Sequence, residues 1–286
     1  MLGRLACNPH NPDVQPTVWH RDTTRRAAMS RARVNGIEID YAVSGSGLAV
    51  LLLSHGYSAT RRMWDGQHRA LDGRYQVISW SMRGHGQTES PGDPSQYSAG
   101  LTVADMEALL RHLRVERAVV GGLSLGGYVS LAFYLAHPEM VRALVICDSG
   151  PGYRNAEARA AWNQRAHERA SELEARGLDA LSDRSREMRE AMGEHRSAQG
   201  LAHAARGMLA QGGSHVIDGL ASVSVPTLII VGDQDQPFFA PSEYMAKKIP
   251  GARLEVIPGA GHSSNLDQPE AFNRVLSDFL DSLPAA

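Results

Sequence analysis

The chain has 286 residues, of which 29 are basic and 31 acidic, giving a formal net charge of −2. This balance gives no support to nucleic acid or an anionic membrane as a partner. Apolar residues make up 43% and charged residues 21%, which is typical of a soluble globular protein. The length allows one large domain or two small ones. Cys7 and Cys147 lie far apart in the sequence. So few cysteines argue against a disulfide framework and favour a cytoplasmic location.

The first 28 residues contain Pro, Asn and Arg but no apolar stretch of the kind that a secretory signal needs. We interpret residues 1–28 as a disordered extension, with an organelle transit peptide as the alternative. A well-patterned segment begins directly after Met29, which is therefore a second candidate for the true start. No run approaches the roughly 18 apolar residues that a membrane span requires, so no membrane partner is expected.

The first half of the chain predicts a mostly parallel sheet. Asn35 and Gly36 separate two runs of alternating apolar residues and predict an antiparallel hairpin. After it, short apolar runs alternate with amphipathic stretches, which implies strands joined by right-handed helical crossovers. Strands are predicted over residues 48–56, 75–81, 117–122 and 141–148, and helices over 99–115 and 125–138.

The alternation stops near Gly150 and resumes at residue 225. Residues 151–215 are rich in Ala, Arg, Glu and Met, contain no strand-like run, and predict three or four helices. Strands then follow over 225–233 and 252–259, and helices over 241–248 and 269–283. We therefore expect a core of residues 29–150 and 216–286, and a helical cap of residues 151–215. Such a cap would cover the carboxyl ends of the strands, where ligands bind in open α/β sheets.

The stretch "VVGGLSLGGYVSL", residues 119–131, places a Gly-x-Ser-x-Gly pattern between a predicted strand and a predicted helix. A sharp strand-to-helix turn holds its apex residue at strained backbone angles, and the positions two before and two after it admit little beyond glycine. Ser124 would then stand at a helix N-terminus, where free N–H groups favour a developing negative charge. The alternative is a glycine-rich turn with a capping serine.

A serine hydroxyl needs a base to act as a nucleophile. His262 lies in a loop between the last predicted strand and the last predicted helix, where it could reach the carboxyl edge of the sheet. The imidazole in turn needs a group that orients it. Asp233 and Asp235 directly follow a buried strand and are both candidates. The order Ser, Asp, His along the chain is the order in which one particular fold carries its three catalytic residues.

These motifs resemble the α/β-hydrolase superfamily over residues 34–283, in particular serine carboxylesterases and related lactonases, C–C hydrolases and cofactor-free haloperoxidases. The matching motifs are His55-Gly56, Arg83-Gly84-His85-Gly86, the turn at Ser124, Gly232-x-x-Asp235 and Gly261-His262. The resemblance implies an α/β fold with a mostly parallel sheet flanked by helices and an inserted helical cap. It also implies Asp235 as the acid, with Asp233 as a turn residue and Asp148 as a rival from the preceding strand.

The same resemblance implies an oxyanion hole made by the backbone N–H groups of Leu125 and Tyr57. Trp162, Met188 and Phe238 are large apolar residues that could line a substrate pocket, with packing between cap and core as the alternative. A cap arginine facing inward would favour carboxylated substrates. No metal or cofactor is implied, since the sequence has neither an H-E-x-x-H motif nor a phosphate-binding loop at this turn.

We therefore expect a serine hydrolase that cleaves small to medium apolar carboxylic esters through an acyl-enzyme. A lactonase or C–C bond hydrolase with the same three residues is the first alternative. The second is a ligand receptor that keeps the fold with a slow triad, which would give at most single-turnover cleavage. The expected partner is a small-molecule ester; the sequence leaves the oligomeric state open, a homodimer included.

Overall fold

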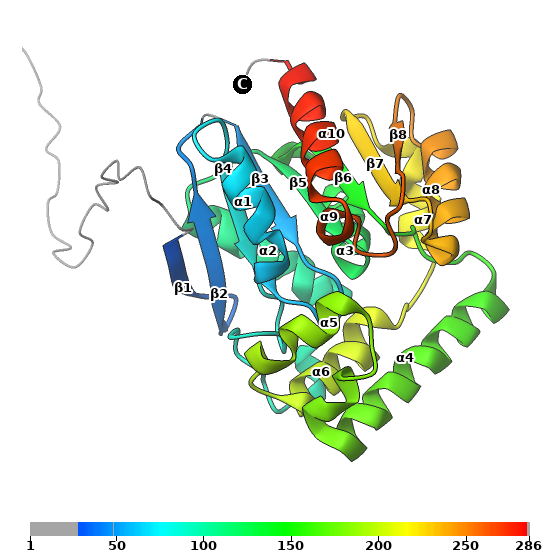
Figure 1. Cartoon of the computed structure of the whole chain (residues 1–286). Coiled ribbons are helices and arrows are strands. Elements are labelled where there is room, and N and C mark those ends of the chain that lie inside the picture. The colour runs from blue at the N-terminus through cyan, green and yellow to red at the C-terminus, as the bar shows by residue number, and fades with distance from the viewer. Residues whose placement is uncertain (1–27, 48, 285–286) are drawn as a thin grey trace, which may run out of the picture.

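A computed structural model describes residues 28–47 and 49–284, so the extension expected over residues 1–28 lies outside it except for Ala28. One sheet of eight strands forms the centre of the molecule, in the order β1-β2-β4-β3-β5-β6-β7-β8 (Figure 1). The strands are β1 Ala28–Val34, β2 Ile37–Ser44, β3 Val50–Ser54, β4 Gln76–Trp80, β5 Ala118–Leu123, β6 Val141–Cys147, β7 Thr227–Gly232 and β8 Arg253–Ile257. Strand β2 is antiparallel to both its neighbours, and all other pairs are parallel. The predicted α/β class is confirmed.

The hairpin predicted at Asn35-Gly36 joins β1 to β2. Asn35 and Gly36 have φ angles of 46° and 81°, which matches the left-handed backbone that a two-residue hairpin turn requires. The turn sets the register in which Val34 lies opposite Ile37. This antiparallel hairpin forms one edge of the sheet, and the parallel strands extend from β4 to β8 at the other edge.

Helices cover both faces of the sheet because its central strands are apolar on both sides. Along β3, Leu51 and Leu53 pack with α1 (Asp65–Leu71) and α10 (Pro269–Ser282), while Leu52 packs on the opposite face. That opposite face is covered by α2 (Ala99–His112), α3 (Leu125–Ala136) and α8 (Gln236–Lys248). Each helix thereby buries its apolar stripe against the sheet.

Three helical details differ from the prediction. Helix α8 begins at Gln236 rather than at residue 241, because Pro237 is tolerated in a first helical turn and the helix continues through Pro241. The short helices α1 and α9 (Ser264–Asp267) were not expected. Both have too few residues to show a helical period in the sequence.

The chain between β6 and β7 forms the helices that we call the cap. They are α4 (Ala156–Arg176), η4 (Gly177–Leu181), α5 (Arg186–Ala191), η5 (Met192–Glu194), α6 (Ala198–Ala204) and η6 (Ala205–Leu209). Figure 1 shows α4, α5 and α6 gathered at one end of the sheet. The Tyr57 hydroxyl, just after β3, donates to the Leu201 carbonyl of α6 at 2.9 Å. The cap therefore lies over the carboxyl end of this strand. In contrast, α7 (His215–Gly219) packs on α3.

Among the described residues, no helix combines the length and the apolar character needed to cross a membrane.

A buried ion pair joins the loop after β4 to α2. The Arg83 guanidinium donates to both carboxylate oxygens of Asp105, at 2.7 and 2.6 Å, and both side chains are almost fully buried. The Asn35 side-chain amide, from the hairpin turn, donates to the same carboxylate at 2.8 Å. Burial raises the pKa of Asp105, and the hydrogen bonds and charge of Arg83 oppose that shift. The pair thus connects three segments that are distant in sequence.

Replacing Asp105 by Ala is expected to lower the free energy of unfolding by about 3–5 kcal/mol, because it leaves the Arg83 guanidinium buried without a carboxylate. Urea unfolding measures this loss. The matched control is Arg111→Ala on the same helix, which removes only an exposed pair with Glu107 and should change stability by less than about 0.5 kcal/mol. Equal losses for the two variants would contradict the assignment.

Candidate active site

Ser124 stands at the turn between β5 and α3, with φ 55° and ψ −116°. This φ lies in the left-handed region, which a residue with a side chain adopts only when its surroundings impose it. The surroundings do so here. The Ser124 N–H donates to the Cys147 carbonyl of β6 at 2.9 Å, and the Ser124 carbonyl accepts from the Tyr128 N–H and the Ser149 hydroxyl. The backbone is thus held on both sides, and the Ser124 side chain faces a cavity.

The glycines beside Ser124 are required by close backbone contacts. A Cβ added at Gly122 would lie 2.5 Å from the Ser54 carbonyl oxygen, and one at Gly126 would lie 2.2 Å from the same oxygen. No real Cβ approaches an oxygen so closely, so β3 is packed against the turn in a way that only glycine permits. The spacing noted in the sequence therefore reflects the sterics of the strand-to-helix turn.

His262 and Asp235 are brought together from two different loops. His262 follows β8 and Asp235 lies directly before α8, and the His262 Nδ1 is 2.9 Å from the Asp235 Oδ2. Because a carboxylate only accepts, Nδ1 carries the proton and donates it in this bond. The lone pair of the neutral ring is then on Nε2, which leaves that atom free to accept a proton.

The charge around His262 favours its protonated form. Burial lowers the pKa of His262, but the hydrogen bond and charge of Asp235 outweigh that effect, with further contributions from Asp148 and Glu187. The net result is a pKa above the usual value of 6.5. Phe238 stacks on the His262 ring, with ring centroids 4.8 Å apart and planes 26° apart. This contact restricts how the imidazole can rotate.

Ser124 and His262 line the same cavity. Among the described residues, no hydrogen bond joins the Ser124 hydroxyl to His262. Contacts between a nucleophile and its base are often long before a substrate is bound and tighten around it.

The structure separates the three aspartates that the sequence left as candidates for the acid. Asp233 accepts from the Gly259 N–H at 2.9 Å and so stabilises a turn. Asp148 is fully buried and accepts from the Gly232 N–H and from the N–H and hydroxyl of Ser264. Burial raises the pKa of Asp148 to about 7, although these hydrogen bonds oppose the shift. Only Asp235 is bonded to His262.

The backbone donors expected for an oxyanion hole lie beside Ser124. Leu125 is the first residue of α3, where the N–H groups have no partner within the helix. A Cβ at Gly56, next to Tyr57, would lie 3.5 Å from the Ser124 Cβ, so the loop after β3 touches the turn. Among the described residues, neither the Leu125 nor the Tyr57 N–H donates to another protein group. Both are available to a ligand.

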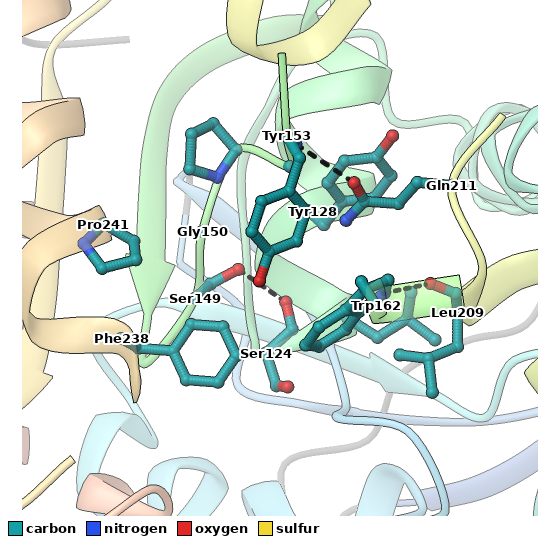
Figure 2. Close-up of a pocket in the computed structure, with 13 residues that line it drawn as sticks. Ser124, Tyr128, Ser149, Gly150, Tyr153, Trp162, Leu209, Gln211, Phe238 and Pro241 are labelled. Carbon is teal, nitrogen blue, oxygen red and sulfur yellow. Dashed lines mark hydrogen bonds between the residues drawn. The ribbon is translucent and has the colours of Figure 1, made fainter. Parts of the chain in front are cut away.

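Two hollows meet at Ser124. One is a cavity of about 750 Å³ and the other a small pocket of about 60 Å³, and Trp162 and Phe238 line both. Figure 2 shows the small pocket, in which the side chains of Ser124, Tyr153, Trp162 and Phe238 surround one space. Met188 lines only the larger cavity. All three residues expected at a substrate pocket therefore line a cavity that Ser124 also lines, and their role toward a substrate stays a prediction.

The larger cavity also contains charged side chains of the cap that the sequence interpretation did not single out. It is lined by Arg165 and Arg169 of α4, by Arg184, which precedes α5, and by the buried Glu187 of α5. The helical spacing of Trp162, Arg165 and Arg169 places them on one face of α4, and this spacing was the sequence signal that could have identified the arginines.

Among the described residues, no group of three or more His, Cys, Asp or Glu side chains is placed to hold a metal ion.

The arrangement can perform acyl transfer. It combines a hydroxyl on a strained turn, an imidazole oriented by a carboxylate, and two backbone N–H groups near Ser124 that have no partner among the described residues. These are the groups needed to attack a carbonyl carbon, carry the proton and stabilise the oxyanion.

Comparison with known proteins agrees with this description. A relative from Bacillus subtilis, provisionally named 2-succinyl-6-hydroxy-2,4-cyclohexadiene-1-carboxylate synthase, is 28% identical over 86% of this chain and 96% of its own length. The 3-oxoadipate enol-lactonase 1 of Acinetobacter baylyi is 28% identical over 91% of this chain and 96% of its own. The malate-bound structure of a thermophilic esterase from Thermogutta terrifontis matches with a TM-score of 0.75 and 28% identity, covering 91% of this chain and all of that one.

The model of the family described as "Alpha/beta hydrolase family" matches residues 50–275, which is most of the chain and includes Ser124, Asp235 and His262. The chain therefore belongs to the alpha/beta hydrolase family and is a hydrolase.

Proposed function

We propose that this hydrolase cleaves small to medium carboxylic esters through an acyl-enzyme, with Ser124 as the nucleophile, His262 as the base and Asp235 as its orienting acid. The observation that carries the proposal is the bond from His262 to Asp235 beside the cavity that Ser124 also faces. In this proposal residues 151–215 form the cap that completes the substrate site. A cytoplasmic location and a homodimer stay predictions.

The proposed reaction has two halves. The Ser124 hydroxyl oxygen attacks the ester carbonyl carbon while His262 Nε2 accepts the hydroxyl proton. The oxyanion that forms is bound by the N–H groups of Leu125 and Tyr57, each of which should contribute about 3 kcal/mol to lowering the barrier. The C–O bond to the alcohol then breaks, and His262 gives its proton to the departing oxygen. Water, deprotonated by His262, cleaves the acyl-enzyme and releases the acid.

The size of the small pocket supports a short group on one side of the carbonyl. A volume of about 60 Å³ holds on the order of four water-sized groups, and its walls are mainly apolar. The stacked Phe238 forms part of this wall and also contacts the His262 ring. A short alkyl or acyl group would therefore pack beside the reacting atoms.

A lactonase is the second candidate, and the name of the Acinetobacter baylyi enol-lactonase favours it. Ring opening of a lactone uses the same attack at the carbonyl carbon, but the alcohol stays attached to the product. A comparison of a lactone with an open-chain ester of the same carbon count would separate the two candidates.

With p-nitrophenyl acetate, butyrate, octanoate and laurate, we expect kcat/KM to be highest for acetate or butyrate. It should be roughly 10-fold or more lower for laurate, because the small pocket cannot hold a long chain. Steady-state release of nitrophenol measures this series. The control is Ser124→Ala, which should remove turnover while the circular dichroism of the fold is kept. A single burst without turnover in the wild type would instead favour a binding protein with a slow triad.

The pH profile tests the role of Asp235. Because only the neutral imidazole accepts a proton, kcat/KM should rise with pH through a pKa above 6.5, in the direction that the charge of Asp235 imposes. Asp235→Asn removes the group that stabilises the imidazolium, so the pKa should fall and the rising limb should move to lower pH. We also expect kcat to fall on the order of 10³–10⁴-fold, since the ring loses the partner that sets its tautomer.

Asp233→Asn is the matched control for that substitution, because it lies two residues away and contacts only a turn. Its profile should be unchanged. If Asp235→Asn kept nearly full activity while Asp148→Asn lost it, we would assign the role of the acid to Asp148 instead.

A further inference from the structure

The larger cavity has a cationic wall that the proposed chemistry at Ser124 does not use. Arg165 and Arg169 come from α4, and Arg184 precedes α5. All three line the same cavity of about 750 Å³ as Ser124 and His262. A hydrolase that needed only an apolar pocket would gain nothing from charged side chains facing its substrate, since desolvating a charge costs free energy.

The acidic groups of the cavity are already engaged elsewhere. Asp235 accepts from His262, and Asp183 accepts from Arg176 outside the cavity at 2.8 Å. Glu187 accepts from two serine hydroxyls, at 2.5 and 2.6 Å. None of these carboxylates is bonded to an arginine of the cationic wall, so they do not neutralise it directly.

The three arginines differ in their own partners. Arg184 forms an ion pair with Glu172, and Arg165 lies over the Trp162 ring at 5.7 Å from its centroid. Within the part of the chain that the structure describes, Arg169 makes no hydrogen bond and no ion pair. Arg169 is nevertheless only partly exposed. Arg165 likewise makes neither bond among the described residues, but it is exposed, so Arg169 is the half-buried arginine of this wall whose donors no described protein group takes.

The surroundings of Arg169 make a charged ligand favourable. Burial lowers the pKa of Arg169, and the nearby charges of Arg184 and Arg165 lower it further, whereas Tyr57 and Glu172 partly oppose the shift. A guanidinium keeps its charge even so, because its ordinary pKa is far above neutral pH. An anion placed against it would replace lost hydration and offset the repulsion among the three arginines.

We propose that Arg169, flanked by Arg165 and Arg184, binds a carboxylate of the substrate, so that the ester carries a short apolar group on one side and an anionic group on the other. This inference rests on the proposed function, because it takes the ester carbonyl to lie at Ser124 between the small pocket and the cationic wall. The planar guanidinium fits a carboxylate with two parallel hydrogen bonds. A doubly charged phosphate fits less well, since Asp183 and Glu187 also face this cavity.

Two ester pairs test the proposal, each pair differing only in whether a carboxylate is free or methylated. One is 4-acetoxybenzoate and methyl 4-acetoxybenzoate, with the charge on the alcohol side. The other is monomethyl adipate and dimethyl adipate, with the charge on the acyl side and the release of methanol as the readout. The measured quantity is the ratio of kcat/KM for the anionic ester to that for the neutral ester, and Ser124→Ala supplies the background rate.

We expect the wild type to prefer the anionic member of at least one pair, mainly through a lower KM. Arg169→Gln should lower that ratio roughly 10- to 100-fold, the value of a lost charge-assisted hydrogen bond, because it weakens binding of the anionic ester far more than that of the neutral ester. Arg169→Lys should recover part of the ratio because it restores the charge without the planar fork. Arg186→Gln is the control, since Arg186 is an exposed cap arginine paired with Glu190 and should leave the ratio unchanged.

A binding measurement tests the carboxylate site independently of the proposed ester hydrolysis. Calorimetric titration of the Ser124→Ala protein with the same esters requires no turnover. Tighter binding of an anionic ester that is lost when Arg169→Gln is added would support the carboxylate site even if the wild type proved inactive. Equal binding and equal kcat/KM within both pairs would overturn the carboxylate site, while turnover of the neutral esters would leave the proposed function intact.

Discussion

The contact of the Ser54 carbonyl with Gly122 and Gly126 is the constraint on which the site depends. The end of β3 is packed so closely against the turn from β5 into α3 that a side chain at either glycine would overlap it. The turn is therefore sharp, Ser124 is held at φ 55°, and α3 begins at the next residue. The same packing puts the loop after β3, which carries Tyr57, beside the N-terminus of α3. The positions of the proposed nucleophile and of the proposed oxyanion donors thus follow from one steric arrangement.

The chemistry around this turn is divided between core and cap. The core supplies the groups that we propose to react, since Asp235 and His262 both lie in loops at the carboxyl edge of the sheet. The cap supplies the surfaces that would select a substrate, with Trp162 beside the small apolar pocket and Arg169 in the larger cavity. In this proposal, the core residues determine the reaction class and the cap residues determine the choice of substrate.

Much of this core could be predicted from the sequence, because its signals are local. The glycine spacing around Ser124 and the turn at Asn35-Gly36 each express a backbone constraint within a few residues. The cap was predictable as helices but not as a surface, because which side chains face the cavity depends on how α4 lies relative to Ser124 and to the loop after β3. Arg169 shows this: its spacing from Trp162 places both on one helix face, but no local rule says that this face meets Ser124. The pairing of His262 with Asp235 rather than Asp148 likewise depends on loop geometry.

The pKa of His262 depends on two buried carboxyls near its ring, those of Asp235 and Asp148. Asp235 accepts a hydrogen bond from the imidazole N–H. Asp148 instead accepts from Gly232 and Ser264, and burial raises its pKa to about 7. As the pH rises through that value, Asp148 loses its proton and adds negative charge near the ring, which favours the imidazolium. Conversely, the positive charge of His262 lowers the pKa of Asp148. The two groups therefore titrate together, and a measured pKa belongs to the pair rather than to either residue. This coupling gives Asp148 an influence on the protonation of His262 without a direct hydrogen bond between the two side chains.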